Sequence, residues 1–163
     1  MERIEIVRAG GERLEEIGPI WRSLSDHHAE ITPRELPVRP AEDGWPVRRP
    51  RYERSLADGA ALFIAEGSEG PLGYAFAISK GAPANLAIER VLEVETLAVL
   101  PEARGAGIGG ALLDEVRELA AELGIKHIQL PVRTANEGAL RFYERQGFAP
   151  LFVTLVATRA DIS

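Results

Sequence analysis

The chain has 163 residues, of which 45% are hydrophobic and 27% are charged, and this composition is typical of one folded domain covering residues 1–163. Its formal net charge of −6 argues against nucleic-acid binding, because a phosphate-binding surface needs clustered lysines and arginines. The absence of cysteine excludes disulfides and a thiolate nucleophile, and no apolar stretch resembles a signal peptide or a membrane span, so we expect a cytoplasmic protein without a membrane partner.

The N-terminal third predicts one strand and then helices around a loop. Alternating isoleucines predict a strand over residues 3–8. Apolar side chains at helical spacing follow over residues 11–29, where Gly18-Pro19 leaves open whether they form one helix or two. Five prolines within residues 31–50 predict a long loop, and a short helix is expected at residues 52–57.

The middle of the chain predicts a hairpin, a central strand and an amphipathic helix. Residues 60–65 and 72–79 are expected to pair around a glycine-rich turn. Residues 91–99 predict the central strand of the sheet. The helix expected over residues 108–123 ends at Gly124, a residue suited to the left-handed backbone that follows a helix.

The C-terminal part predicts a strand, a short helix and a last strand. Residues 128–132 carry alternating apolar side chains. Asn136 is suited to cap a helix that runs through Tyr143 and ends at Gly147. Residues 148–158 are expected to close the chain as a strand. Strands joined late in the chain by crossover helices predict a mixed sheet of the α/β (α+β) class.

The most informative motif is the glycine-rich turn between the central strand and the amphipathic helix, residues 104–110. Its backbone N–H groups and the helix N-terminus can converge on one anion, such as a pyrophosphate. Gly105, Gly107 and Gly110 also match the nicotinamide-dinucleotide spacing, but the acidic residue expected about 20 positions later is missing. A P-loop is excluded because no Gly-Lys-Ser or Gly-Lys-Thr follows.

This turn resembles the pyrophosphate loop of the GNAT (Gcn5-related N-acetyltransferase) superfamily, whose pattern Arg/Gln-x-x-Gly-x-Gly/Ala is matched by residues 104–109. Downstream, Asn136 with Ala139, Phe142-Tyr143 and Gly147-Phe148 resembles the second cofactor motif of that family. The resemblance implies the GNAT acyl-CoA N-acyltransferase fold, a central mixed sheet of six to seven strands flanked by about four helices. It covers residues 91–148 specifically and the rest of the chain only in architecture.

The resemblance also implies residue roles around acetyl-coenzyme A as cosubstrate. The implied coenzyme contacts are Leu97, Ala98 and Val99 on the central strand, Arg104, Gly105, Ala106, Gly107, Ile108 and Gly109 in the loop, and Asn136, Ala139 and Tyr143 downstream. Tyr143 matches the tyrosine that protonates the departing thiolate, and its alternative reading is a core aromatic residue on an amphipathic helix.

Glu93 and Glu95 are the candidates for the base that activates the acceptor amine. On a regular strand both side chains point to the same face as Leu97 and Val99, where the thioester is expected. The alternative is a solvated face on which both glutamates are ordinary surface residues. His27 and His28 are weaker candidates, near the end of the first helical region where this family places acceptor-binding residues.

The implied reaction is direct attack of a primary amine on acetyl-coenzyme A in a ternary complex, with no metal. A non-catalytic acyl-CoA-binding module is the alternative. The expected partners are acetyl-coenzyme A and an amine acceptor, and a homodimer stays open. The arginine-rich segment from Pro33 to Arg54 suggests that Arg48 and Arg49 bind an anionic group of the acceptor. The alternatives are contact with the 3′-phosphate of the coenzyme, or pairing with the neighbouring carboxylates Glu35, Glu42, Asp43 and Glu53.

Overall fold

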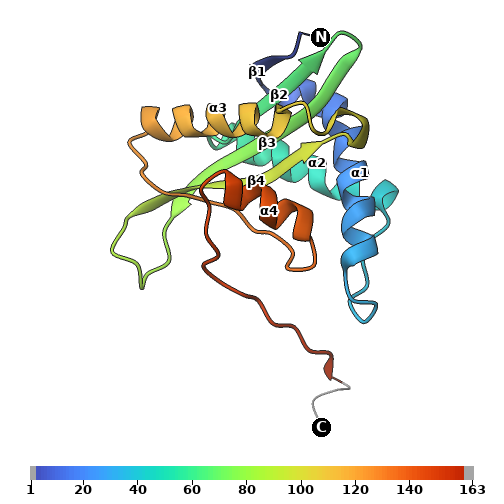
Figure 1. The fold of residues 1–163 in the computed structure, drawn as a ribbon, viewed down its shortest axis with the longest axis vertical. Helices are drawn as coiled ribbons and strands as arrows, with labels where there is room; N and C mark the ends of the chain where they lie inside the picture. The colour runs from blue at the N-terminus through green and yellow to red at the C-terminus, as the bar shows by residue number, and fades with distance from the viewer. Residues whose placement is uncertain (1–2, 160–163) are drawn as a thin grey trace.

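The computed structural model describes residues 3–159, which form a mixed sheet with helices on both faces (Figure 1). The strands are β1 (Glu5–Ala9), β2 (Ala61–Gly67), β3 (Gly70–Gly81), β4 (Arg90–Val99) and β5 (Ile128–Gln129). They lie in the order β1-β2-β3-β4-β5, with antiparallel pairing from β1 to β4 and parallel pairing between β4 and β5. The α/β class is confirmed, but residues 3–159 contain five strands and not six to seven.

Helices α3 (Ile108–Glu122) and α4 (Glu137–Arg145) cover one face of the sheet (Figure 1). The buried face of α3 carries Leu112, Leu113 and Val116, which pack on alanines and aliphatic residues of β2, β3 and β4. Gly124 follows the helix with φ = +68°, as its position after the last apolar residue predicted. Asn136 caps α4 by accepting a hydrogen bond from the Ala139 N–H at 3.2 Å, which confirms the expected cap.

Helices α1 (Leu14–Ile31) and α2 (Ala41–Ala57) cover the opposite face and contact each other. Gly18-Pro19 does not divide the first helical region, because α1 is continuous with Pro19 inside it. Three side chains of its buried face, Leu14, Ile17 and Ile20, are almost wholly removed from water. Their burial offsets the hydrogen bond that the proline cannot donate.

The prediction of a loop over residues 31–50 is wrong for its second half, since α2 begins at Ala41 and contains Pro46 and Pro50. A proline inside a helix costs about 3 kcal/mol relative to alanine, so local propensity alone would not form this element. Trp45 and Tyr52 are buried against the sheet, and burying two aromatic side chains contributes enough to outweigh that cost. Tertiary packing therefore decides the conformation of α2.

A β-bulge interrupts the ladder between β3 and β4. Phe76 lies opposite Thr96 and the next residue, Ala77, lies opposite Val94, which leaves Glu95 as an extra residue in β4. An extra residue reverses the alternation of side chains beyond it. Even-numbered residues of the first half of β4, Leu92 and Val94, therefore face the same helix layer as the odd-numbered Leu97 and Val99 of the second half.

This reversal corrects the predicted faces of β4. Leu97 and Val99 pack on the α3 side, whereas Glu93 lies opposite Ile78, which packs on the α1–α2 side. Glu95 contacts α2 directly. The prediction that the glutamates share a face with Leu97 and Val99 is wrong, because the bulge separates the two pairs.

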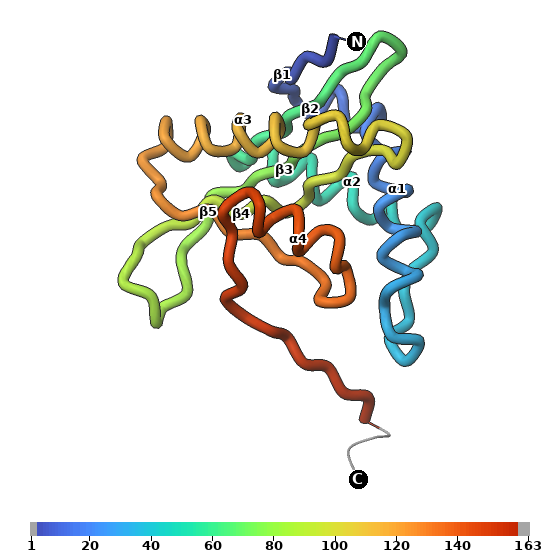
Figure 2. The backbone as a smooth tube through the Cα atoms, in the orientation of Figure 1, coloured from blue at the N-terminus to red at the C-terminus, as the bar shows by residue number. Residues whose placement is uncertain are grey.

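Strand β5 is shorter than predicted and diverges from β4. Only Leu92–Ile128 and Glu93–Gln129 are paired between the two strands. Beyond Gln129 the chain leaves the ladder (Figure 2), and Pro131, which lacks a backbone N–H, lies two residues past its end. A gap therefore opens between the second half of β4 and the segment after β5.

The predicted last strand is absent: residues 148–158 form neither helix nor strand within the described chain. They run away from the sheet in an extended course (Figure 1). Strand-forming side chains need a neighbouring strand to pair with, and none is present beside this segment among residues 3–159.

Among the helices of residues 3–159, none combines the length and the apolar character that crossing a bilayer requires.

Candidate active site

The glycine-rich loop has the backbone geometry of an anion-binding turn. Gly105 and Gly107 have φ values of +82° and +80°, a region that glycine enters without steric cost. Gly107 caps α3, and the first helical bond runs from the Ala111 N–H to the Gly107 carbonyl at 3.0 Å. The N–H groups of Ile108 and Gly109 come before that bond, so they are available at the positive end of the helix dipole.

Two contacts hold this loop against the rest of the site. A Cβ atom added at Gly109 would lie 2.9 Å from Cζ of Phe142, so the missing side chain allows α3 and α4 to approach closely. Arg104 donates from Nε to the Val99 carbonyl at 3.2 Å, which joins the loop to the end of β4. The loop, the strand end and α4 thus form one continuous surface.

We expect Gly107→Val to abolish binding of acetyl-coenzyme A. A branched side chain at φ = +80° is strained, and it would turn the amides of the loop away from a common anion. Isothermal titration calorimetry measures the loss. Gly138→Ala in α4 is the matched control, because a Cβ atom there meets nothing within 4 Å and its φ lies outside the positive region. Equal affinity in both variants would contradict the assigned role of the loop.

A cavity of about 200 Å³ lies in the gap between β4 and the segment after β5. It brings together five predicted site residues from β4 and from α4 with its N-cap: Glu95, Leu97, Asn136, Ala139 and Tyr143. Glu93, Ala98 and Val99 are not among its lining residues, and the buried Ala98 side chain packs on the α1–α2 side.

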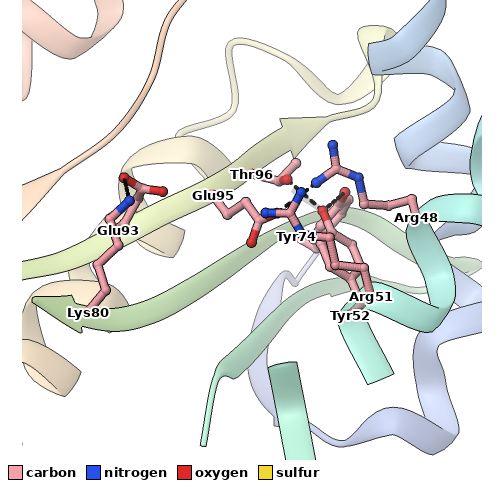
Figure 3. A network of polar contacts seen from close by, with 8 residues as sticks. All are labelled: Arg48, Arg51, Tyr52, Tyr74, Lys80, Glu93, Glu95 and Thr96. Carbon is pink, nitrogen blue, oxygen red and sulfur yellow. Dashed lines mark hydrogen bonds and ion pairs between the residues drawn. The ribbon is translucent and has the colours of Figure 1, made fainter. Parts of the chain in front are cut away.

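Glu95 is the most constrained charged group of the cavity. Its side chain is only 8% exposed, and its Oε1 atom contacts Arg48 at 2.7 Å and Arg51 at 2.9 Å (Figure 3). Its Oε2 atom is buried and accepts no hydrogen bond from the residues that the structure describes. The carboxylate is thus fixed through one oxygen while the other remains an unused acceptor, an arrangement that suits an incoming N–H donor.

Glu93 lies in a different environment on the same strand. Its Oε2 atom accepts a hydrogen bond from Gln129 at 2.7 Å and forms an ion pair with Lys80 at 2.7 Å. Figure 3 shows the Glu93–Lys80 pair at a distance from the cluster around Glu95. The structure therefore separates the two candidate bases and brings only Glu95 to the cavity.

Tyr143 is a packed aromatic residue that also lines the cavity. Its ring packs against Phe142 and Phe148, with centroid distances of 5.1 and 5.8 Å, and it also lines the cavity. Burial raises the pKa of Tyr143 to about 12. The phenol therefore keeps its proton across the neutral range and can act as a proton donor.

The acetyltransferase (GNAT) family model matches residues 21–148 of this chain. The chain belongs to this family. It is 33% identical over 122 residues to streptothricin acetyltransferase of Streptomyces lavendulae, a match covering 71% of this chain and 61% of that relative. It is 34% identical over 128 residues to a mycothiol acetyltransferase of Propionibacterium freudenreichii subsp. shermanii, covering 76% and 38%. The chain spans less than two thirds of the length of these curated relatives.

Solved structures agree with this family assignment in fold. The crystal structure of a predicted acetyltransferase with acetyl-CoA from Clostridium acetobutylicum superposes with a TM-score of 0.73 at 18% identity, covering 98% of both chains. At that identity the likeness shows the fold alone. It confirms that this GNAT chain has the expected architecture.

Other residues of the cavity in this GNAT domain were indicated weakly or not at all by the sequence. Trp21 comes from α1 and was missed, and the guanidinium of Arg48, which was predicted only as an anion-binding residue, lies 5.9 Å from the centre of a Trp21 ring. Arg133 follows β5. His28, only weakly indicated, lines the cavity too, and burial with the nearby Arg133 lowers its pKa to about 4, so its imidazole is neutral at neutral pH. Only the fold brings these four residues together.

Arg48 and Arg49, the two arginines predicted to bind an anion, are both paired with carboxylates. Arg48 is paired with Glu95, and Arg49 is paired with Glu15 at 2.5 Å and Glu53 at 3.2 Å. Pairing with neighbouring carboxylates was one alternative, and only the Arg49–Glu53 pair belongs to the neighbours named for it. The partners are mainly distant in sequence, which explains why they could not be named from the local charge pattern.

Proposed function

We propose that this GNAT domain transfers the acetyl group of acetyl-coenzyme A to a primary amine by direct attack in a ternary complex. The observation that carries the proposal is the cavity between β4 and the segment after β5. It is lined on one side by Glu95, with a buried and unused carboxylate oxygen, and on the other by Tyr143, a phenol that retains its proton. An acceptor and a donor of protons therefore flank one space.

The proposal assigns coenzyme binding to the loop and to the edge of β4. The amides of residues 105–109 suit the pyrophosphate, since they lie at a helix N-terminus and two of the glycines have positive φ. Leu97 to Val99 suit the pantetheine arm, because β5 no longer pairs with this part of β4. Asn136 and Ala139 at the start of α4 complete the assigned contacts.

Acetyl-coenzyme A supplies an activated acyl carbon and a thiolate leaving group. In the proposed reaction the amine nitrogen forms a bond to that carbon, the carbon–sulfur bond breaks, and the thiolate takes a proton from the Tyr143 hydroxyl. Glu95 accepts a proton from the amine, directly at Oε2 or through a water molecule. Arg48 and Arg51 act as positioning residues, because they hold the Glu95 oxygen that is not used.

The proposal does not specify which amine is acetylated, because two relatives are named for chemically different acceptors. Streptothricin and mycothiol acetyltransferases are each similar to this chain over more than two thirds of its length. Charge gives some guidance: the unused Glu95 oxygen favours an ammonium group, and Arg133 at the cavity is an added hydrogen-bond donor. Amino sugars, polyamines, amino acids and lysine peptides all belong in the first panel.

The test combines binding with turnover. We expect calorimetry to give saturable binding of acetyl-coenzyme A and none of nicotinamide dinucleotides, and a thiol reagent to detect free coenzyme A with at least one amine. Binding without thiol release, across a broad panel that includes streptothricin, would favour the alternative of a non-catalytic acyl-CoA-binding module. Binding of a nicotinamide dinucleotide in place of acetyl-coenzyme A would contradict the assignment of the loop.

A further inference from the structure

The cavity between β4 and the segment after β5 has one charged group that the proposed reaction does not use, the guanidinium of Arg133. Its side chain makes no hydrogen bond and no ion pair with any of residues 3–159. The other arginine of the cavity lining, Arg48, is paired with Glu95 at 2.7 Å. Arg133 therefore offers an open cation on the cavity wall, and a guanidinium can hold a planar carboxylate through two N–H donors.

The charges that line the cavity do not balance. Two arginines, Arg48 and Arg133, accompany one carboxylate, that of Glu95. The phenol of Tyr143 keeps its proton, and the imidazole of His28 is neutral because burial and the nearby Arg133 lower its pKa to about 4. The lining thus has one positive charge in excess, although the chain as a whole has a net charge of −6. A ligand with one negative charge would complement it.

Arg133 and His28 lie close together on the cavity wall, although they come from different elements. His28 belongs to α1 and Arg133 follows β5, and the charge of Arg133 is near enough to affect the imidazole. A neutral imidazole has one N–H donor, which adds to the two that a guanidinium directs at a carboxylate. Apolar side chains make up much of the remaining lining, among them Trp21, Leu24 and Leu130. The volume of about 200 Å³ is below the range of about 300–1,000 Å³ usual for drug-sized ligands, so it suits a small molecule.

From these features we infer that the acceptor is a small amine that also carries a carboxylate: Glu95 receives the amine, and Arg133 with His28 holds the carboxylate. This acceptor class rests on the proposed function and narrows it. Arg133 takes no part in bond making and determines specificity by orienting the amine. An uncharged partner group leaves the excess positive charge uncomplemented, and a polyamine adds to it, so both are poorer acceptors. A phosphate monoester, with a charge of about −1.5 to −2, exceeds the single charge available.

Matched pairs of acceptors test this specificity. Amino acids from glycine to 6-aminohexanoate are compared with their primary amides, which keep the amine and the chain length but lose the negative charge. At the favoured length we expect kcat/KM to be about 10- to 100-fold higher for the acid, as for one hydrogen bond to a charged group. Arg133→Gln should bring this ratio to within about threefold of one, mainly by raising KM for the acid, since the contact is the same before and during the reaction. Arg54→Gln is the matched control, because Arg54 is an exposed arginine of α2 outside the cavity lining, and it should keep the ratio.

Charge reversal gives the second readout. Arg133→Glu is expected to reverse the preference, so that the amide, or a diamine of the same length, reacts faster than the acid. Calorimetry with acetyl-coenzyme A shows whether each variant is folded and binds its cosubstrate, and the affinity should stay within about threefold of the wild type. A loss of coenzyme affinity in Arg133→Gln would overturn the inference, because Arg133 would then serve the coenzyme. An acid-to-amide ratio near one in the wild type would also overturn it.

Binding without turnover separates the acceptor class from the proposed reaction. Each acid and each amide is titrated by calorimetry into protein saturated with coenzyme A. Binding of the acid alone, lost in Arg133→Gln, with no thiol release from acetyl-coenzyme A in any mixture, would reject acetyl transfer and keep the carboxylate site. Thiol release with equal binding of acid and amide would reject the carboxylate site and keep acetyl transfer. If no compound binds or reacts, both are rejected.

Discussion

Tyr143→Phe is expected to lower kcat by about 10²- to 10⁴-fold, the range usual for a positioned proton donor, while the affinity for acetyl-coenzyme A changes little. The ring contacts with Phe142 and Phe148 remain in the variant, so only the hydroxyl is removed. If the variant and the wild type unfold at the same thermal midpoint, the loss of turnover reflects the missing hydroxyl and not a folding defect. Steady-state kinetics and calorimetry on the same preparation give both quantities.

The pH dependence makes this prediction more specific. The ordinary pKa of a tyrosine is about 10, and burial raises the pKa of Tyr143 to about 12. The neutral phenol is therefore the form present below that value, and the donor is lost only as the pH rises towards it. Between about pH 6 and about pH 10 the wild-type and Tyr143→Phe profiles should be parallel. A variant whose turnover equals the wild type would assign Tyr143 to packing alone.

Glu95→Gln is expected to lower kcat/KM by about 10²-fold or more near neutral pH, with partial recovery in alkaline solution. The substitution keeps the shape of the side chain and removes the proton acceptor next to the cavity. A free primary amine has a pKa near about 10.4, so at high pH more of the substrate is already deprotonated and the base is needed less. A pH–rate profile for the variant and the wild type measures this difference.

Glu93→Gln is the matched control for that experiment. Glu93 is on the same strand and is also ion-paired, but it is not among the residues that line the cavity. We expect its kcat/KM to stay within about threefold of the wild type, as for a residue outside the reacting space. Since Glu95→Gln leaves Arg48 and Arg51 without a charged partner, its unfolding midpoint is measured in parallel. A large effect of Glu93→Gln with none of Glu95→Gln would reverse the assignment of the base.

Local signals in the sequence predicted the parts of the site that depend on local chemistry. The loop at Gly105 and Gly107 requires positive φ, and only glycine occupies that region easily, so the residue type itself identifies the turn. The cap at Asn136 is equally local, because the side chain bonds an N–H three residues later. The amphipathic helix α3 was recognisable from its spacing alone.

Features that depend on pairing between distant segments were not predictable in this way. A regular strand over Val91 to Val99 would place every second side chain on the same face, and only the register with β3 shows that Glu95 is an extra residue. Pro46 and Pro50 predicted a loop because local propensity cannot include the burial of Trp45 and Tyr52. Residues 148–158 have the pattern of a strand, but whether a strand forms depends on a partner strand that the pattern does not identify.

The position of Arg48 one turn from Tyr52 has a consequence for how the active site moves. The Tyr52 hydroxyl is hydrogen-bonded to Thr96 at 2.5 Å, and its ring is stacked on Phe76 with centroids 4.0 Å apart. The helix that orients Glu95 is therefore anchored in the most buried part of the fold. Displacing the carboxylate breaks its ion pairs with Arg48 and Arg51, and Arg48 belongs to a helix that this buried contact holds in place. Under the proposed function, we therefore expect any adjustment to the acceptor to come from α1 and from the unpaired segment after β5.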